Sequence, residues 1–342
     1  MNYNWLLKDT IFNKDKGKVF TCFSGGGGSS LGYKLAGFDV IGCNEIDKRM
    51  MDVYIANHNP KYSFLESIST LKVRDDLPKE LYDLDILEGS PPCSAFSMAG
   101  QREENWGKEK KFREGQVSQV LDTLFFDFID LAKKLQPKIV IAENVKGLLQ
   151  GQAKEYVKKI YQEFNNAGYN CDHYLLNASN MGVPQKRERV FFIAYRKDLP
   201  FSHFHLNLDF NEKPITFGEF YQKGVNDRKV STGKMFEYWQ NRRNGDANFA
   251  DTIMRVEGKH RCFNNYYLYQ KKVCNTYTSN DDVLFLFDEY RKPNKSESCC
   301  IGSFPQDYNF VKEKYNYVIG MSVPPLMTAK ISKEIYDKWL KI

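Results

Sequence analysis

Apolar runs typical of β-strands alternate with helical patterns over the first 196 residues of the chain. The strand-like runs lie at 18–23, 38–47, 82–90, 138–145, 171–179 and 189–196, and the helical patterns at 48–57, 118–135 and 153–167. Within 118–135, apolar side chains recur at steps of three and four residues, which indicates one buried helix face. Strands that alternate with helices favour a parallel sheet covered on both faces, so we predict an α/β fold.

The alternation stops near residue 200, where the chain becomes polar, aromatic and irregular. We interpret 200–290 as a second, smaller domain. From residue 314 the pattern predicts a strand and a turn, followed by an amphipathic helix over 326–341. The predicted organisation is therefore a domain at 1–199, a second domain at 200–290, and a return to the first domain at 291–342.

The formal net charge of +6 is concentrated in one part of the chain. The window from Lys213 to Lys272 holds 12 Lys and Arg residues against 6 Asp and Glu residues, so its charge alone is +6. The same window is rich in aromatic residues, and basic residues interleaved with aromatics suit a nucleic-acid partner. An ordinary solvated basic face is the alternative interpretation, because this charge is not extreme.

Cysteine spacing and hydropathy exclude several other classes of protein. The eight cysteines include no CxxC pair, and Cys299 and Cys300 are adjacent, which disfavours both a zinc site and a disulfide framework. No apolar run reaches the roughly 18 residues of a membrane span. The N-terminus shows no signal-peptide pattern. We expect a soluble, cytoplasmic protein that has no metal site and no membrane association.

A glycine-rich turn, FSGGGGSS, lies where the first strand gives way to the first helical pattern. Glycines allow a ligand to approach the backbone there, and a helix N-terminus offers free N–H groups. The pattern fits F-x-G-x-G-G from Phe23 to Gly28 and not G-x-G-x-x-G, because Ser30 takes the third glycine position. Glu45 follows at the end of the second strand, where a carboxylate can accept ribose hydroxyls. Together these features indicate nucleoside binding.

Cys93 lies directly behind two prolines in GSPPCSAFS, at the end of another apolar strand. Prolines fix φ and remove backbone donors, so this segment is stiff. Stiffness of that kind suits a sulfur atom that must be held in one place. None of the five histidines lies on a strand end in a recognisable motif, so a Cys-His hydrolase is poorly supported.

Two further strand ends carry polar side chains that could act with Cys93. Glu143 and Asn144 follow the run KIVI, and Arg187 and Arg189 precede the run VFFIAYR. A thiolate, a carboxyl group and a guanidinium around one ring suit nucleophilic addition to a pyrimidine. The sulfur adds to C6, the carboxyl group bonds to N3, and an arginine holds O2. An ordinary ion pair between Glu143 and Arg189 is the alternative.

The ordered set FSGGGG, NEID, PPCSAFS, ENV, QKRER and GMSVPP resembles the cytosine-C5 DNA methyltransferases, and it spans residues 18 to about 330. The resemblance implies a Rossmann-like class I methyltransferase sheet with helices on both faces, plus an irregular target-recognition domain at 200–290. It also implies transfer of a methyl group from S-adenosylmethionine to C5 of a flipped-out cytosine in double-stranded DNA. The segment 98–117 would be the mobile loop that closes on the DNA.

The resemblance also assigns roles to individual residues. The implied catalytic residues are Cys93, Glu143, Arg187 and Arg189. The next adenine contact after Ile46 falls in FLESIST, where Glu66 and Ser67 are both candidates. The implied cofactor contacts are Phe23, Gly25, Gly27, Gly28, Glu45, Ile46, Ser67, Ile68 and Ser322. As partners we expect double-stranded DNA and a separately acting restriction endonuclease, with the enzyme itself a monomer of prokaryotic or phage type.

The sequence departs from the family pattern at two places. Ser296 and Cys300 stand where the family has two arginines before a Phe-Pro, so arginine-based support of the recognition domain is in doubt. Met321 stands where the family has asparagine. Two alternative functions stay open: methylation of tRNA by the same chemistry, and DNA binding by a catalytically decayed scaffold.

Overall fold

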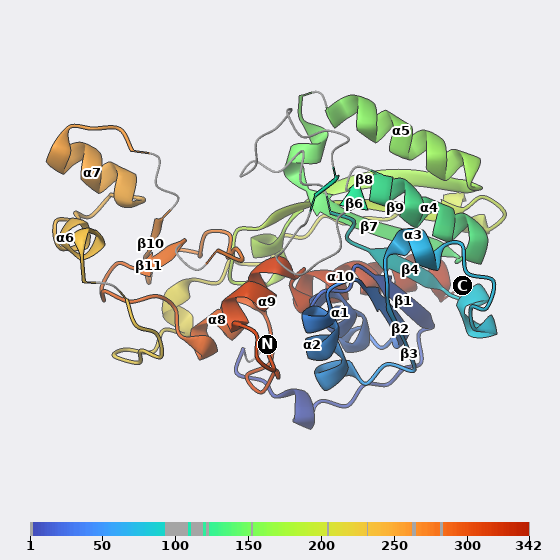
Figure 1. Cartoon of the computed structure of the whole chain (residues 1–342), viewed down its shortest axis with the longest axis horizontal. Helices are drawn as coiled ribbons and strands as arrows, with labels where there is room; N and C mark the ends of the chain where they lie inside the picture. The colour runs from blue at the N-terminus through green and yellow to red at the C-terminus, as the bar shows by residue number, and fades with distance from the viewer. Residues whose placement is uncertain are drawn as a thin grey trace. The chain divides into compact units, whose positions relative to one another are not determined.

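The computed structural model describes residues 3–92, 123–151, 153–203, 205–230, 232–261, 265–280 and 283–341, with the backbone of 109–110 and 119–120. The chain forms two compact units (Figure 1). The sheet unit comprises Ile11–Asn177, Glu188–Asp209 and Thr328–Ile342, and the second unit comprises Met1–Thr10, Ala178–Arg187 and Phe210–Met327. The second unit thus groups 291–327 with 210–290. The assignment of 200–290 to target recognition is a statement about function and stays a prediction.

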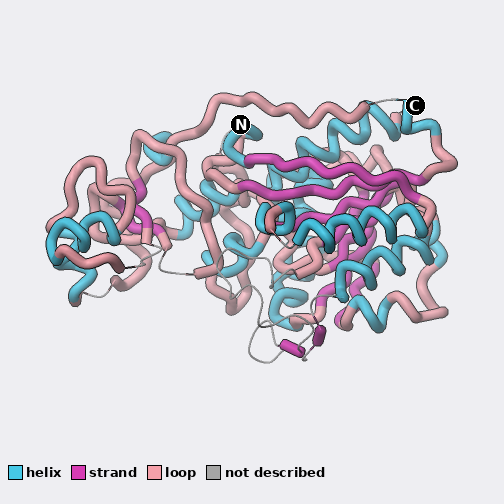
Figure 2. The backbone as a smooth tube through the Cα atoms, turned by 90° about the horizontal axis from the view of Figure 1, so that it is seen from above, coloured by secondary structure: helices cyan, strands magenta, loops and turns pink. Residues whose placement is uncertain are grey.

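The sheet unit is built on seven strands in the order β3-β2-β1-β4-β7-β9-β8, which lie side by side in Figure 2. Five neighbouring strands are parallel, as predicted for four of them; the sequence pattern missed the fifth, β3, which is four residues long. The strands are β1 (Lys18–Cys22), β2 (Asp39–Glu45), β3 (Tyr62–Leu65), β4 (Ile86–Gly89), β7 (Ile139–Val145), β8 (Tyr169–Asn177) and β9 (Glu188–Arg196). The carboxyl ends of β1, β2, β4 and β7 therefore meet at one edge of the sheet.

The prediction of a wholly parallel sheet is wrong for β9. This strand runs antiparallel to both β7 and β8. Parallel neighbours need a crossover of a dozen or more residues, whereas antiparallel neighbours can be joined by a shorter connection. Only residues 178–187 join β8 to β9, and they belong to the second unit.

Helices cover both faces of the sheet. On one face, α3 (Ile68–Leu71), α4 (Leu124–Leu135) and α5 (Ala153–Asn166) pack on Phe20, Leu87 and Phe192 of the strands. On the other face lie α1 (Gly28–Leu35) and α2 (Lys48–His58), whose Ser30 and Tyr54 hydroxyls approach Thr21 of β1. Side chains alternate between faces along a strand, so β1 contributes to both cores.

Two secondary-structure predictions need correction. The predicted helix at 118–135 begins at Leu124, because 119–120 form the short strand β6 (Gln119–Val120), which pairs with β5 (Glu109–Lys110). The strand and turn predicted after residue 314 is a helix, α9 (Tyr315–Met321), with Val318 and Ile319 buried. Short apolar runs are compatible with either element, and packing decides between them.

The second unit has a small core of its own. Its elements are α6 (Lys234–Gln240), α7 (Phe249–Glu257), β10 (Tyr266–Leu268), β11 (Leu284–Leu286), α8 (Lys295–Gly302) and α9. Strands β10 and β11 are parallel. Helix α10 (Pro325–Ile335) carries the chain back into the sheet unit and continues as a π-helical turn at Tyr336–Leu340. Short 3-10 helices lie at Leu7–Asp9, Lys79–Tyr82, Lys146–Leu149, Ala178–Met181, Pro200–His203 and Phe217–Glu219.

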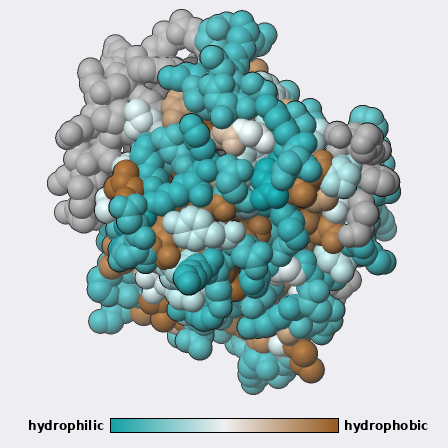
Figure 3. Space-filling model, turned by 90° about the vertical axis from the view of Figure 1, so that its right-hand side faces the viewer, coloured by the Kyte–Doolittle hydropathy of each residue, from teal (hydrophilic) through white to brown (hydrophobic). Residues whose placement is uncertain are grey.

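Apolar residues are scattered among hydrophilic ones on the face that Figure 3 shows. Exposed large apolar side chains, such as Val73 at 66%, occur singly along the chain. Among the described residues, no helix combines the length and the apolar character needed to cross a membrane.

Candidate active site

The glycine turn follows β1 with the backbone conformation that glycine permits. Gly25 has φ of 50° and Gly27 has φ of 87°, and Gly27 is the N-cap residue of α1. Phe23 also has a positive φ of 52°, which is uncommon for a residue with a Cβ atom. A Cβ atom added at Gly25 would meet no heavy atom within 4 Å. The turn therefore borders open space at the carboxyl end of β1.

Glu45 at the end of β2 is tied to this turn by its carboxylate. Oε2 accepts a hydrogen bond from the Gly25 N–H at 2.7 Å, and Oε1 accepts from the N–H groups of Ile46 at 2.8 Å and Asp47 at 2.9 Å. A carboxylate has about four acceptor sites, so about one is left for a ligand hydroxyl. Burial raises the pKa of Glu45, and the three backbone N–H groups oppose that shift. The sequence predicts that this carboxylate accepts both ribose hydroxyls. Three of its acceptor sites are already used, so fewer remain for the ribose than that prediction needs.

Asn44 places the loop after β3 next to the end of β2. Its side-chain amide donates to the carbonyl oxygens of Phe64 at 3.2 Å and Glu66 at 2.7 Å. The sequence interpretation gave Asn44 no role, although its place beside Glu45 in NEID is a signal. A buried amide between two strand ends fixes the geometry of both.

The two candidates for the next adenine contact have different partners. The Glu66 carboxylate accepts from Arg74 at 2.9 Å, whereas the Ser67 hydroxyl caps α3 by accepting from the Thr70 N–H at 3.1 Å. Ile68, which follows, is 1% exposed and belongs to the core under the sheet. The choice between Glu66 and Ser67 therefore stays open.

Glu143 and Arg189 meet on one face of the sheet. Arg189 is the second residue of β9 and pairs with Val145 of β7, two residues beyond Glu143. Its Nε lies 2.9 Å from Glu143 Oε1, and the two side chains are 16% and 11% exposed. This is the ion pair that the sequence allowed as an alternative, and it also places a carboxyl group beside a forked donor, as addition to a pyrimidine requires.

Asn144 connects this pair with the proline segment. Its Nδ2 donates to the Pro91 carbonyl at 3.1 Å, and its Oδ1 accepts from the Val145 N–H at 2.9 Å. Asn144 is 4% exposed, so the bond forms away from competing water. Asn144 of β7 thus fixes Pro91, the first of the two prolines that precede the predicted nucleophile. Cys93 itself lies outside the described residues, as does the predicted loop 98–117 apart from the backbone of 109–110.

Arg187 is buried in the second unit, where its guanidinium has main-chain partners. It is 3% exposed and donates to the carbonyl oxygens of Tyr277 at 3.0 Å and Gly320 at 3.1 Å. Gln185, 1% exposed, accepts from the Tyr277 N–H at 3.1 Å and donates to the Ile301 carbonyl at 2.9 Å. The first half of the QKRER motif therefore holds the second unit together, while Arg189 reaches Glu143.

The C-terminal motif forms the end of α9. A Cβ atom at Gly320 would lie 2.2 Å from the Thr278 carbonyl carbon, so only glycine fits there. Met321 is 40% exposed, and the Ser322 hydroxyl donates to the Val318 carbonyl at 2.7 Å. Ser322 is thus already hydrogen-bonded within its own helix.

Arg291 supplies the arginine support that Ser296 and Cys300 cannot. Its Nη1 and Nη2 atoms lie 2.7 Å and 2.9 Å from the two oxygens of Glu297, and both residues are at most 2% exposed. The forked pair is a strong, directional contact. Sequence reasoning missed it because Arg291 lies outside the motif.

Several aromatic residues of the basic window belong to a hydrophobic core cluster of the second unit. Tyr238, Phe249 and Tyr267 are at most 5% exposed. The guanidinium of Arg242 stacks 3.4 Å over the Trp239 ring. Packing alone accounts for the presence of these aromatic side chains in the window. They therefore give no support to nucleic-acid binding, and that interpretation depends on the exposed basic residues.

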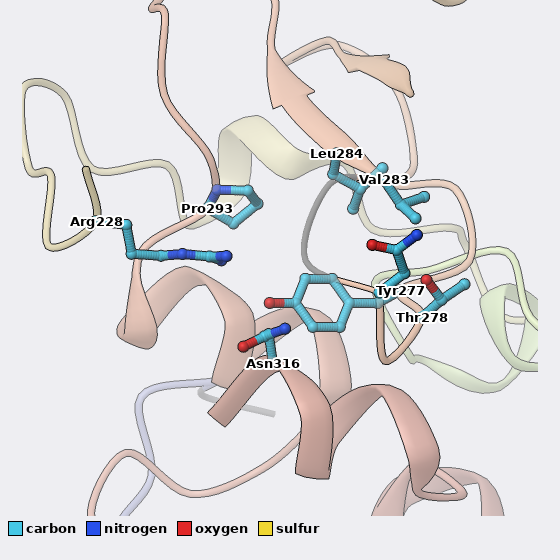
Figure 4. A pocket seen from close by; sticks show the side chains of 8 residues that line it. Arg228, Tyr277, Thr278, Val283, Leu284, Pro293 and Asn316 are labelled. Atoms are coloured by element: carbon cyan, nitrogen blue, oxygen red, sulfur yellow. The ribbon is translucent and has the colours of Figure 1, made fainter. Parts of the chain in front are cut away.

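A separate small pocket, with room for about one water molecule, lies within the second unit (Figure 4). Arg228, Tyr277 and Asn316 point into it, and the Tyr277 hydroxyl donates to Ser298 at 2.8 Å. None of the predicted site residues lines this pocket. Across the described ranges, no cluster of His, Cys, Asp and Glu could hold a metal ion.

Comparisons with known proteins agree with this geometry. The C-5 cytosine-specific DNA methylase model matches residues 17–337. The chain is 39% identical over 196 residues to the Type II methyltransferase M.FnuDI of Fusobacterium nucleatum, covering 57% of this chain and 52% of that protein. It therefore matches only about half the length of that relative.

Longer matches extend over most of the chain. It is 30% identical over 334 residues to the Type II methyltransferase M.AplI of Arthrospira platensis, covering 93% of this chain and 85% of that protein. A prophage-encoded Escherichia coli protein, described as a DNA modification methyltransferase, shares the fold with a TM-score of 0.67 at 23% identity, covering 94% and 99% of the two chains. The chain belongs to the C-5 cytosine-specific DNA methylases.

Proposed function

We propose that the protein is a DNA (cytosine-5-)-methyltransferase that acts on a cytosine flipped out of double-stranded DNA. The observation that carries this proposal is the Glu143–Arg189 pair at the carboxyl end of β7, with Asn144 bound to Pro91 just before Cys93. In the proposed complex the Glu143 carboxyl group, the Arg189 guanidinium and the Cys93 thiol would act on one planar ring.

In this mechanism the Cys93 thiolate attacks C6 of the cytosine. Glu143 holds N3 through a hydrogen bond or a proton, so that negative charge from the addition is neutralised on the ring. Arg189 holds O2 and orients Glu143 through the contact seen between them. The addition makes C5 nucleophilic; after methylation, loss of the C5 proton and β-elimination release Cys93. Arg187 acts at a distance, by keeping Tyr277 and Gly320 in place.

The cofactor we propose is S-adenosylmethionine, which supplies an electrophilic methyl group when bound. The residues fit it: the open space at Gly25 can take a ligand, and Glu45 has acceptor capacity for a ribose hydroxyl. Phe23, Gly27, Gly28 and Ile46 would form the rest of the pocket. Further proposed cofactor contacts are Ser67, Ile68 and Ser322. Ile68 is itself part of the hydrophobic core of the sheet unit.

We assign recognition of the DNA sequence to residues 200–290. Exposed residues such as Lys271 and Lys272 would bind phosphates. Several aromatic residues of the window pack instead in a core cluster. We also propose that the enzyme acts as a monomer, and that a restriction endonuclease acts separately on the same site.

The test compares the wild type with Cys93→Ser on duplex DNA that carries 5-fluorocytosine. With S-adenosylmethionine present, methyl transfer leaves C5 with a fluorine and no proton to lose. Elimination of Cys93 is then blocked, so an active enzyme stays covalently attached, whereas the serine variant should not. Bisulfite sequencing of DNA from expressing cells then gives the methylated sequence. A decayed scaffold would give no adduct with any DNA, and a tRNA methyltransferase would transfer methyl groups to tRNA and not to the duplex.

A further inference from the structure

Glu88 is a buried acid that the proposed mechanism does not use. It lies on β4, five residues before Cys93, and is 3% exposed. Its Oε1 accepts a hydrogen bond from the Ser29 hydroxyl at 2.9 Å, and Ser29 lies 3.4 Å from the Thr328 hydroxyl of α10. In the part of the chain that the structure describes, no basic side chain forms an ion pair with Glu88. Burying an unpaired charge costs free energy, so an apolar residue at this position would destabilise the fold less than a charged one.

The surroundings of Glu88 favour its neutral form. Burial raises its pKa to about 8, Glu143 adds to the shift, and the Ser29 hydroxyl opposes it. The other titratable groups that face it are Cys22 on β1, Tyr33 on α1 and Tyr54 on α2, all of them neutral near pH 7. Glu143 is therefore the only charged group among these neighbours, and it has the same sign.

Glu88 lies between the glycine turn and the reacting pair. Ser29, its hydrogen-bond partner, is the second residue of α1, directly after the turn. Across the sheet, Glu88 pairs with Ile141 on β7, two residues before Glu143, so the two acids share one face. A cofactor with its amino-acid part at the turn, and its methyl group facing a cytosine held by Glu143, would bring its sulfur atom to this part of the sheet.

We propose that Glu88 makes cofactor binding sensitive to charge: its carboxylate favours the positive sulfur of S-adenosylmethionine over the neutral sulfur of S-adenosylhomocysteine. This inference rests on the proposed function. No basic side chain among the described residues pairs with Glu88, so the cofactor's cation would supply the counter-charge that this buried acid lacks. The enzyme thereby favours the methyl donor over its own product.

Binding of the cation should displace the proton of Glu88. If the positive sulfur lowers the pKa of this carboxyl by about one unit, roughly half a proton is released per S-adenosylmethionine bound at pH 7.5. The sign follows from linkage: the charged carboxylate binds the cation better, so affinity rises with pH through about 8. The expected rise is about sixfold between pH 6.5 and pH 8.5. S-adenosylhomocysteine should show neither effect.

The experiment is calorimetric titration in two buffers of different ionisation enthalpy, which counts released protons directly. The ligands are S-adenosylmethionine, S-adenosylhomocysteine and sinefungin, an analogue with an ammonium group in place of the sulfonium. Glu88→Gln keeps the acceptor for Ser29 but cannot ionise. Asp83→Asn is the matched control, because it removes the same charge from a side chain that is 78% exposed.

The wild type and Asp83→Asn should release about half a proton with each of the two cationic ligands at pH 7.5, whereas Glu88→Gln should release none. Glu88→Gln should also lose the roughly sixfold pH dependence of the preference for S-adenosylmethionine. Equal proton counts for all three ligands in the wild type would overturn the inference even if the variant failed to fold. Absence of binding by every ligand would instead overturn the proposed cofactor, and this inference with it.

Discussion

Replacement of Arg187 and of Arg189 by lysine should give opposite results, although the two residues are only two positions apart. Arg187 donates from two nitrogens to two main-chain carbonyls, 3.0 Å and 3.1 Å away. A single ammonium group on a lysine stem can keep at most one of them. A hydrogen bond from a charged group contributes about 1.5–3 kcal/mol, so Arg187→Lys should cost about that amount of unfolding free energy.

Arg189 is more exposed and its partner is a carboxylate, so a lysine can keep the charge interaction with Glu143. We expect Arg189→Lys to change the unfolding free energy by less than about 1 kcal/mol. Turnover should nevertheless fall about 100-fold or more, because lysine lacks the planar fork that would hold O2 while it contacts Glu143.

Urea denaturation followed by circular dichroism measures the first effect, and methyl transfer to duplex DNA measures the second. A loss of about 2 kcal/mol corresponds to a midpoint shift of roughly 0.7 M at a slope of about 3 kcal/mol per M. If Arg187→Lys unfolds at the wild-type midpoint but loses turnover as Arg189→Lys does, then Arg187 acts on the substrate and its positioning role is wrong.

Three further changes test other contacts. Glu45→Gln places an amide against backbone N–H groups, so S-adenosylmethionine should bind about tenfold or more weaker by calorimetry; an unchanged affinity would place the ribose elsewhere. Asn144→Ala removes the bond to the Pro91 carbonyl and should slow adduct formation with 5-fluorocytosine DNA about tenfold, with cofactor affinity unchanged. Burial raises the pKa of Glu88 to about 8, above the unfolded value near 4.5, so it stabilises the fold fully below about pH 4.5 and ever less up to pH 8. The unfolding free energy of the wild type should therefore fall over this range more steeply than that of Glu88→Gln, and parallel curves would contradict the shift.

Local sequence patterns were sufficient for the strand ends of the sheet unit. The glycine turn, Glu45, Glu143 and Asn144 each lie where an apolar run predicted the end of a strand. This works because parallel strands bring their carboxyl ends to one edge, so order along the chain already implies proximity in space. The antiparallel β9 did not follow from the pattern, since alternation of strands and helices does not encode strand direction.

Contacts over long sequence separations were decided by the tertiary structure alone. Spacing treated Arg187 and Arg189 as equivalent, but the partners of Arg187 lie 90 and 133 residues further along the chain. Glu297 meets Arg291 although no motif contains both. A guanidinium binds whichever oxygens the fold brings to it, and its neighbours in the sequence do not specify them. The residue types at the site could thus be predicted from the sequence. Packing decided that Arg187 binds main-chain carbonyls while Arg189 contacts Glu143.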